Sequence, residues 1–193
     1  MLSALVMLSA CSGTDYDQAT PEEVDAAAYR PDGPPSMTLI TVVNNRTGAG
    51  GHTALLVSGN QQVIFDPAGS FRDERVAVRG DVIYGVSPAW FNAYKSAHAR
   101  ASHHVVSQTI PLTPEQAETA LQLVQRNGVV APAFCANATS SLMKNIPGFE
   151  NISTTFYPAN LMDQVATRPD VATDRLYEND AGGVVDGIAA AQL

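Results

Sequence analysis

Cys135 is the residue of this chain best suited to act as a nucleophile. Helix-forming and capping residues follow it, so the sequence predicts a helix that begins close to Cys135. A thiol at a helix N-terminus lies at the positive end of the helix dipole, beside free backbone N–H groups, and both favour the reactive thiolate. The same N–H groups could form part of an oxyanion hole. The alternative is a small apolar residue that packs this helix against a sheet.

A nucleophilic thiol needs a base, and His52 is the best placed of the four histidines. It opens a predicted strand directly after the Gly-rich segment 48–51, where a side chain can project toward a cleft. His98 is expected at a helix end, and His103 and His104 at a helix-to-strand junction, as is typical of surface or dipole-complementing residues. No cysteine pair or carboxylate at metal-ligand spacing accompanies them, so we expect neither a metal nor a cofactor.

Asp66 is the candidate group that would orient the His52 imidazole. A tight turn over 58–61 predicts a hairpin between strands 52–57 and 62–65. The start of the first strand then lies beside the end of the second, which brings Asp66 near His52. A slip of one residue in register would place the carboxylate on the other face, and an Asp before Pro is also a common turn residue.

The N-terminus predicts export and lipid attachment. Residues 1–10 form an apolar run of signal-peptide length that is too short to span a bilayer. Leu8-Ser9-Ala10-Cys11 resembles a bacterial lipobox, which implies cleavage before Cys11 and conversion of its thiol to a diacylglyceryl thioether, with palmitate as an acyl group. The resemblance implies a lipid anchor in the bacterial cell envelope, and Ser12 implies the outer membrane, on its periplasmic side. The alternative is a secretory signal with an incidental cysteine.

Composition divides the rest of the chain into a tether, one domain and a tail. Residues 11–36 are acidic and then Pro-rich, which predicts a disordered tether. Residues 37–165 carry the patterns of a single α+β domain with an antiparallel sheet, as suits a chain of 193 residues that is 45% apolar. Residues 166–193 predict a loose tail. The net charge of −8 argues against a nucleic-acid partner.

Periodicity and capping residues place the expected elements of this domain. Strands are expected at 38–43, 52–57, 62–65 and 104–110, and the segment 152–157 is also rich in strand-forming residues. Helices are expected after Ser87, after Thr113 (ending at Gly128), near Cys135, and over 158–162.

The order of the candidate residues, with His52 placed 83 positions before Cys135, is the reverse of that in ordinary papain-like enzymes. It resembles the circularly permuted papain-like proteins, namely the NlpC-type cell-wall peptidases and the relatives of lecithin retinol acyltransferase. Segments 51–57 and 134–139 carry the resemblance, although the acyltransferase branch has Asn-Cys-Glu-His where this chain has Phe-Cys-Ala-Asn. The resemblance implies an NlpC-like fold and an amidase, peptidase or acyl-transfer site. Cys135 would be the nucleophile, His52 the base and Asp66 its orienting group, acting on a peptidoglycan peptide or an acyl substrate.

Two further functions stay open on the sequence. A non-catalytic envelope lipoprotein of the same fold could serve as a binding or scaffold module, and exposed Trp90 and Tyr94 side chains would favour it. A secreted immunity or inhibitor protein would fit the acidic charge, which steers association with a basic partner.

Overall fold

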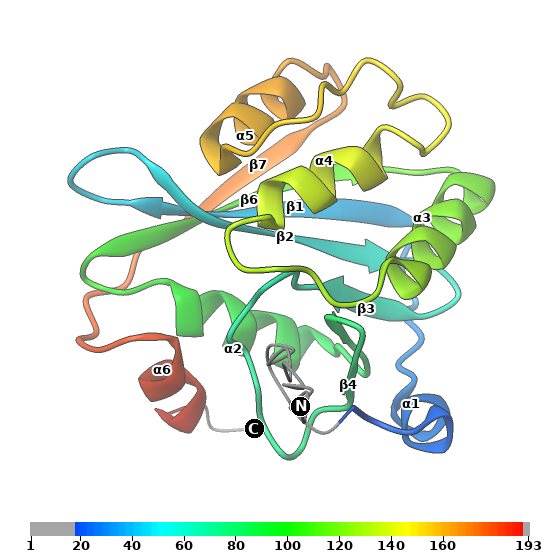
Figure 1. Ribbon diagram of the computed structural model, residues 1–193, viewed down its shortest axis with the longest axis horizontal. Helices are drawn as coiled ribbons and strands as arrows, with labels where there is room; N and C mark the ends of the chain where they lie inside the picture. Colours follow the sequence, from blue (N-terminus) through cyan, green and yellow to red (C-terminus); the bar gives the residue numbers. More distant parts are fainter. Residues whose placement is uncertain (1–17, 191–193) are drawn as a thin grey trace, which may run out of the picture.

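The computed structural model describes residues 18–190 and shows an α+β fold built on an antiparallel sheet (Figure 1). The seven strands lie in the order β4-β5-β3-β2-β1-β6-β7. The strands are β1 (Ser36–Asn44), β2 (Gly50–Ser58), β3 (Gln62–Phe65), β4 (Val78–Arg79), β5 (Val82–Ile83), β6 (His103–Pro111) and β7 (Ala172–Leu176). The long strands β2, β1 and β6 form the centre of the sheet, because each presents apolar residues to both faces.

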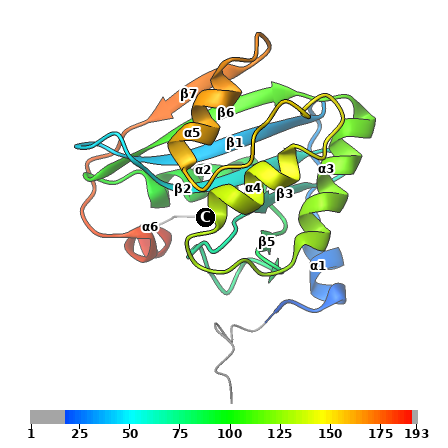
Figure 2. The same cartoon turned by 45° about the horizontal axis from the view of Figure 1, so that its top comes forward.

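Helices cover both faces of the sheet (Figure 2). On one face lie α3 (Pro114–Asn127), α4 (Cys135–Met143) and α5 (Pro158–Ala166), and on the other lie α2 (Pro88–His98) and α6 (Val184–Ala190). Successive side chains along each strand point to opposite faces of the sheet, so each strand contributes to both helix-covered layers. Leu39 and Leu55 pack toward α3, α4 and α5, whereas Ile40 and Ala54 pack toward α2.

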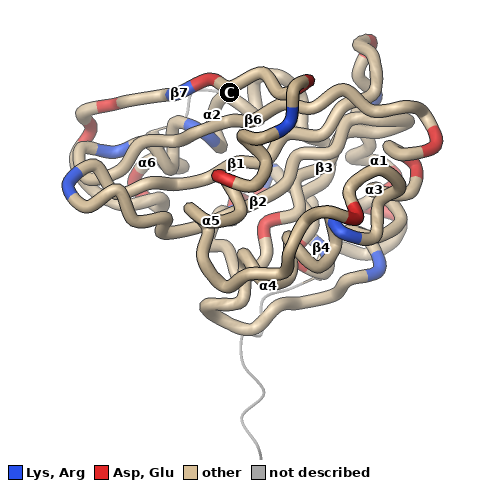
Figure 3. The backbone as a smooth tube through the Cα atoms, turned by 90° about the horizontal axis from the view of Figure 1, so that it is seen from above, with Lys and Arg blue, Asp and Glu red and all other residues tan. Residues whose placement is uncertain are grey.

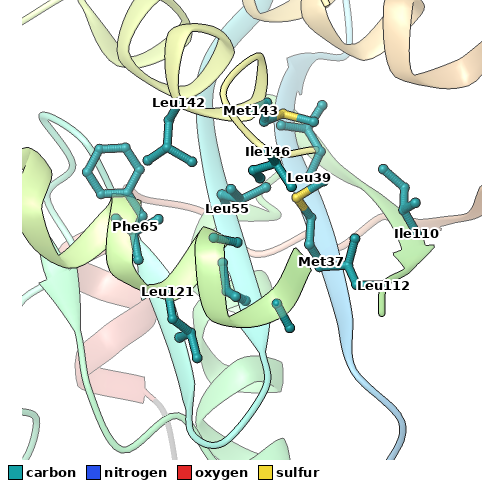
Figure 4. Packing of buried hydrophobic residues seen from close by; sticks show 14 of the residues in the cluster. Met37, Leu39, Leu55, Phe65, Ile110, Leu112, Leu121, Leu142, Met143 and Ile146 are labelled. Carbon is teal, nitrogen blue, oxygen red and sulfur yellow. The ribbon is translucent and has the colours of Figure 1, made fainter. Parts of the chain in front are cut away.

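The core beneath α4 fixes where this helix begins. Leu142 and Met143 at its end, and Ile146 just beyond it, pack with Leu39 and Leu55 of the sheet (Figure 4). All five side chains are buried. Burial of one such side chain contributes about 1.5–3 kcal/mol to folding. The apolar end of α4 therefore anchors the helix and holds its N-terminus at the edge of β2.

The sequence signals at the main elements are confirmed. Ser87 caps α2, and its hydroxyl accepts a hydrogen bond from the N–H of Trp90. Thr113 and Gln116 form the capping box of α3, and Gly128 ends this helix with a positive φ. The four predicted strands are present as β1, β2, β3 and β6, up to two residues longer at either end than expected.

The prediction that 11–36 is a disordered tether is wrong for the part that the structure describes. Residues 18–36 lie against the domain and contain α1 (Pro21–Ala27), which a Thr20–Glu23 capping box starts. The N–H of Gln62 donates to the carbonyl of Tyr29, and Arg79 donates to the carbonyl of Ala19. These hydrogen bonds to the domain offset the conformational entropy that residues 18–36 lose on ordering. The composition of the segment does not reveal such contacts. The signal peptide and Cys11 lie outside the described residues.

The prediction of a loose tail over 166–193 is also wrong for its described part. Residues 172–176 form β7, which pairs with the otherwise open edge of β6. After β7, α6 packs on α2 through Gly187, which lies against Ala97 and Arg100. Strand β7 is polar and mostly exposed, so it lacks the apolar alternation that sequence patterns detect.

The segment 152–157, which is rich in strand-forming residues, is irregular instead. Side chains of the flanking helices satisfy its backbone groups. The N–H of Thr155 donates to the Ser140 hydroxyl, and the Gln164 side chain bonds both the N–H and the carbonyl of Ser153. These bonds replace the strand ladder that its composition favours. Among the described residues, no helix has the length and apolar character needed to cross a membrane.

Candidate active site

The β2–β3 hairpin brings His52 and Asp66 together. The register pairs Val57 with Val63 and Leu55 with Phe65, so Asp66 follows the last pair on the same face as His52. His52 Nε2 lies 2.7 Å from Asp66 Oδ1. The predicted proximity of these two residues is therefore confirmed, with the register that the turn over 58–61 implies.

The Asp66 carboxylate is completely buried and accepts two hydrogen bonds on one oxygen. Oδ1 accepts from His52 and from the hydroxyl of Tyr94, which is 2.7 Å away. Oδ2 has no hydrogen-bond partner among the described residues and lies against Gly69, where any side chain would collide with the carboxylate. Burial raises the pKa of Asp66, but the hydrogen bond and charge of His52 outweigh it, so the pKa falls to about 2.

The His52 ring is held in its charged form between two partners. Burial lowers its pKa, but hydrogen bonds and charge interactions with Asp66 and with the Cys135 thiol raise it further, to about 10. The ring thus hydrogen-bonds the carboxylate and interacts electrostatically with the thiol. This arrangement favours an imidazolium beside a thiolate.

Cys135 is the first residue of α4, as the sequence predicts, and it is buried. The preceding residue, Phe134, gives the helix no side-chain cap among the described residues. Strand β3 pairs with β2 only as far as Leu55, which leaves the backbone edge at Thr53 open to the thiol. Burial raises the pKa of Cys135, but hydrogen bonding to His52, the charge of His52, and the backbone N–H groups of Thr53 and Ala136 bring it below its ordinary value.

Helix α2 adds two residues to the site that sequence reasoning assigned elsewhere. Tyr94 is fully buried and bonds Asp66, whereas the sequence left it open as an exposed aromatic residue of a binding surface. His98 Nδ1 lies 2.8 Å from the Tyr94 carbonyl, and its ring stacks on His52 at 5.8 Å between centroids. Burial lowers the pKa of His98 to about 4, so its ring is neutral. The i, i+4 spacing of Tyr94 and His98 was the available signal, because it puts both on the helix face that meets the sheet.

The site also brings together three potential metal-binding atoms from residues that are far apart in the sequence. One donor atom each from His52, Asp66 and His98 lies within 4.8 Å of the others. The direct hydrogen bond between His52 and Asp66 uses one atom of each, so a cation would have to displace it. The group therefore fits a hydrogen-bonded network better than a formed metal centre.

The remaining histidines stay outside the Cys135–His52 pair. His103 bonds the Ser102 hydroxyl through Nδ1, and His104 bonds Asn45 and stacks on Tyr177. Trp90 is half-buried beside Phe71 and Arg75. Since Tyr94 is buried, the pair of exposed aromatic residues that would have favoured a binding module is not formed.

Comparison with protein-family models, with curated proteins and with solved structures gave no significant match. The functional argument therefore rests on the geometry of Cys135, His52 and Asp66 and on the residues packed around them.

Proposed function

We propose that this protein is a cysteine hydrolase of the cell envelope that cleaves an amide or ester bond. One observation carries the proposal: the same imidazole hydrogen-bonds a buried carboxylate and interacts with a thiol at the start of a helix, whose pKa it lowers. That is the arrangement of nucleophile, base and orienting group that thiol catalysis requires. Three elements supply the groups, namely β2, the end of β3 and α4.

The proposed reaction has two steps. The Cys135 thiolate attacks the substrate carbonyl carbon, the C–N or C–O bond breaks, and His52 gives its proton to the leaving amine or alcohol. A water molecule then attacks the resulting thioester, with neutral His52 accepting its proton, and the acid product leaves as the thiolate is restored. Asp66 holds the imidazole and stabilises its charge in both steps, and the N–H of Cys135 contributes to binding the oxyanion.

The order of the site residues supports a permuted papain-like arrangement as the finer description of this α+β fold. His52 and Asp66 come from neighbouring antiparallel strands, and Cys135 comes later, at a helix N-terminus. We further propose that lipid on Cys11 anchors the protein in the envelope, on the periplasmic side of the outer membrane. The substrate would then be a peptide of the wall or an acyl group at the membrane.

A non-catalytic binding module of the same fold remains the alternative, and one observation favours it. Phe134 and Phe156 are 45% and 54% exposed, and their rings meet edge to face at 5.3 Å beside Cys135. Tyr157, next along the chain, is 74% exposed. Exposed aromatic residues are enriched in binding interfaces.

Hydrolysis assays on wall-peptide fragments and on acyl esters test the proposal. The full chain, purified in detergent, should release product from one of these classes, and Cys135→Ser should lose the activity. Ser141→Ala, on the same helix, is the matched control and should retain it. Wild-type kinetics for Cys135→Ser would refute the proposed nucleophile.

A further inference from the structure

A cavity of about 400 Å³ opens directly beside His52. The end of α2, the start of β6 and the loop before α6 surround it, together with the loop that follows Asp66. His52 and His98 form part of its wall, whereas Cys135 does not. A molecule in this cavity would therefore contact the imidazole side of the site.

The lining of this cavity has an unusual charge for so acidic a protein. The chain has 19 acidic and 11 basic residues, yet the described lining residues include Arg100 and the charged His52, together with neutral His98, and no carboxylate. Figure 3 shows that acidic residues occur at many positions along the backbone of the molecule. Two carboxylates that contact lining residues each accept a hydrogen bond from one of them. Asp66 bonds His52, and Asp186 accepts from the N–H of Gly183.

Arg100 is a buried cation that is only partly compensated. It is 6% exposed, and its Nε donates to the carbonyl of Ala97. Its ion pair is with Asp180, at 3.8 Å from Nη1, and that aspartate side chain is 69% exposed. A contact of this length to a solvated carboxylate neutralises a buried charge poorly. An anion in the cavity would find both space and a favourable field.

Small residues keep the cavity open. Gly51, Gly69, Gly182 and Gly183 lie in its wall, with the hydroxyl of Ser70 at its exposed rim. A side chain at Gly69 would collide with Asp66, and one at Gly182 would collide with Asp186. The space next to His52 is thus available to a ligand and could offer it hydrogen-bond donors.

We propose that this cavity receives the leaving group of the substrate and that this leaving group carries a carboxylate, as a terminal amino acid does. The inference rests on the proposed function, in which His52 protonates the leaving atom. The leaving group must then lie on the imidazole side, which is where the cavity opens. The positive lining selects an anionic group over a neutral one.

Two alkylating probes that differ by one charge test the inference. N-chloroacetylglycine carries a carboxylate where N-chloroacetylglycinamide carries a neutral amide. With either probe, the Cys135 sulfur forms a bond to the CH₂ carbon as the C–Cl bond breaks and chloride leaves. The rate ratio of the two, divided by their ratio with glutathione at the same pH and salt, measures the preference for the anion. We expect a preference of about fivefold or more, the effect of one partly screened ion pair.

Variants test whether the preference for the anionic probe depends on the charge of the cavity or on the overall charge of the protein. Arg100→Gln should bring the preference close to one, while Lys144→Gln, which removes the same charge at the far end of α4, should leave it unchanged. Because Arg100 is buried, its variant is first checked by thermal unfolding. Ser70→Asp, at the exposed rim, serves as the second variant and should also abolish the preference.

The outcomes distinguish this inference from the proposed function. Fast alkylation by the neutral probe that depends on His52, with no preference for the anion, would overturn the carboxylate inference alone. A preference that survives both Arg100→Gln and Ser70→Asp would overturn it as well. Slow alkylation by both probes in the folded wild type would instead contradict the proposed function.

Discussion

Tyr94 and His52 share one oxygen of Asp66, so the tyrosine positions the carboxylate that orients the imidazole. Tyr94→Phe keeps the ring packing and removes only the hydroxyl. We expect a loss of about 1–2 kcal/mol in the free energy of unfolding, because a buried carboxylate loses one hydrogen-bond donor. Urea unfolding measures this change in the free energy of unfolding, with Tyr177→Phe on the exposed surface as the control. Equal stability of Tyr94→Phe and the wild type would show that the shared bond contributes nothing.

The His52–Asp66 pair also predicts how stability changes with pH. The pKa of His52 rises from 6.5 to about 10, so its contribution is fully present below pH 6.5 and is lost as the pH rises through about 10. The pKa of Asp66 falls from 3.8 to about 2, so its contribution is present above pH 3.8 and is lost as the pH falls through about 2.

Stability attributable to the pair should therefore be greatest between about pH 4 and 6.5 and decline on both sides. The measurement is the urea midpoint as a function of pH for the wild type and for His52→Gln. The difference between the two should follow this profile. A difference that stays constant from pH 3 to pH 10 would contradict the charged pair.

At the scale of elements, Gly69 lies where the chain turns past Asp66, and the close approach of its backbone leaves no room for a side chain. Gly69→Ala should displace the carboxylate, lower the free energy of unfolding by about 2 kcal/mol or more, and slow alkylation of Cys135. Gly33→Ala is the matched control, since a side chain there meets no atom within 4 Å. If the two variants had equal stability, the close packing around Asp66 would be disproved.

The elements that could be predicted are those with a local physical signal. The hairpin register follows from the short turn and the two-residue period of β2 and β3, which is why the approach of His52 to Asp66 could be foreseen. The start of α4 at Cys135 followed from its helix-forming residues. The roles of Tyr94 and His98 were not predicted because their partners lie in distant segments of the chain. Helix periodicity predicts which face of a helix is buried, but not which residues that face contacts.

The edges of the fold were predicted least well for the same reason. Strand β7 is polar and exists because it pairs with the edge of β6, and α1 is stable because its flanking residues bond the domain. Both depend on long-range contacts that composition does not reveal. Two-residue strands such as β4 and β5 are too short for any periodicity.

At the scale of the whole molecule, we propose that a hydrolytic domain is carried on a lipid anchor. If Cys11 is lipidated in a bacterial host, the full chain should incorporate labelled palmitate and fractionate with membranes. Cys11→Ser should do neither, while Cys135→Ser should still be labelled. Membrane association and labelling of the Cys11→Ser chain would contradict the anchor, because acyl chains on that residue supply the affinity.

The pH dependence of iodoacetamide alkylation at Cys135 tests the central claim most directly. The full chain in detergent is labelled over a range of pH, and the modified Cys135 peptide is quantified by mass for the wild type and for His52→Ala. A thiolate stabilised by His52 predicts fast labelling well below about pH 8 and at least tenfold slower labelling of the variant near neutral pH. Labelling that begins only when the protein unfolds, or that is equal in the two chains, would mean that Cys135 is a structural thiol.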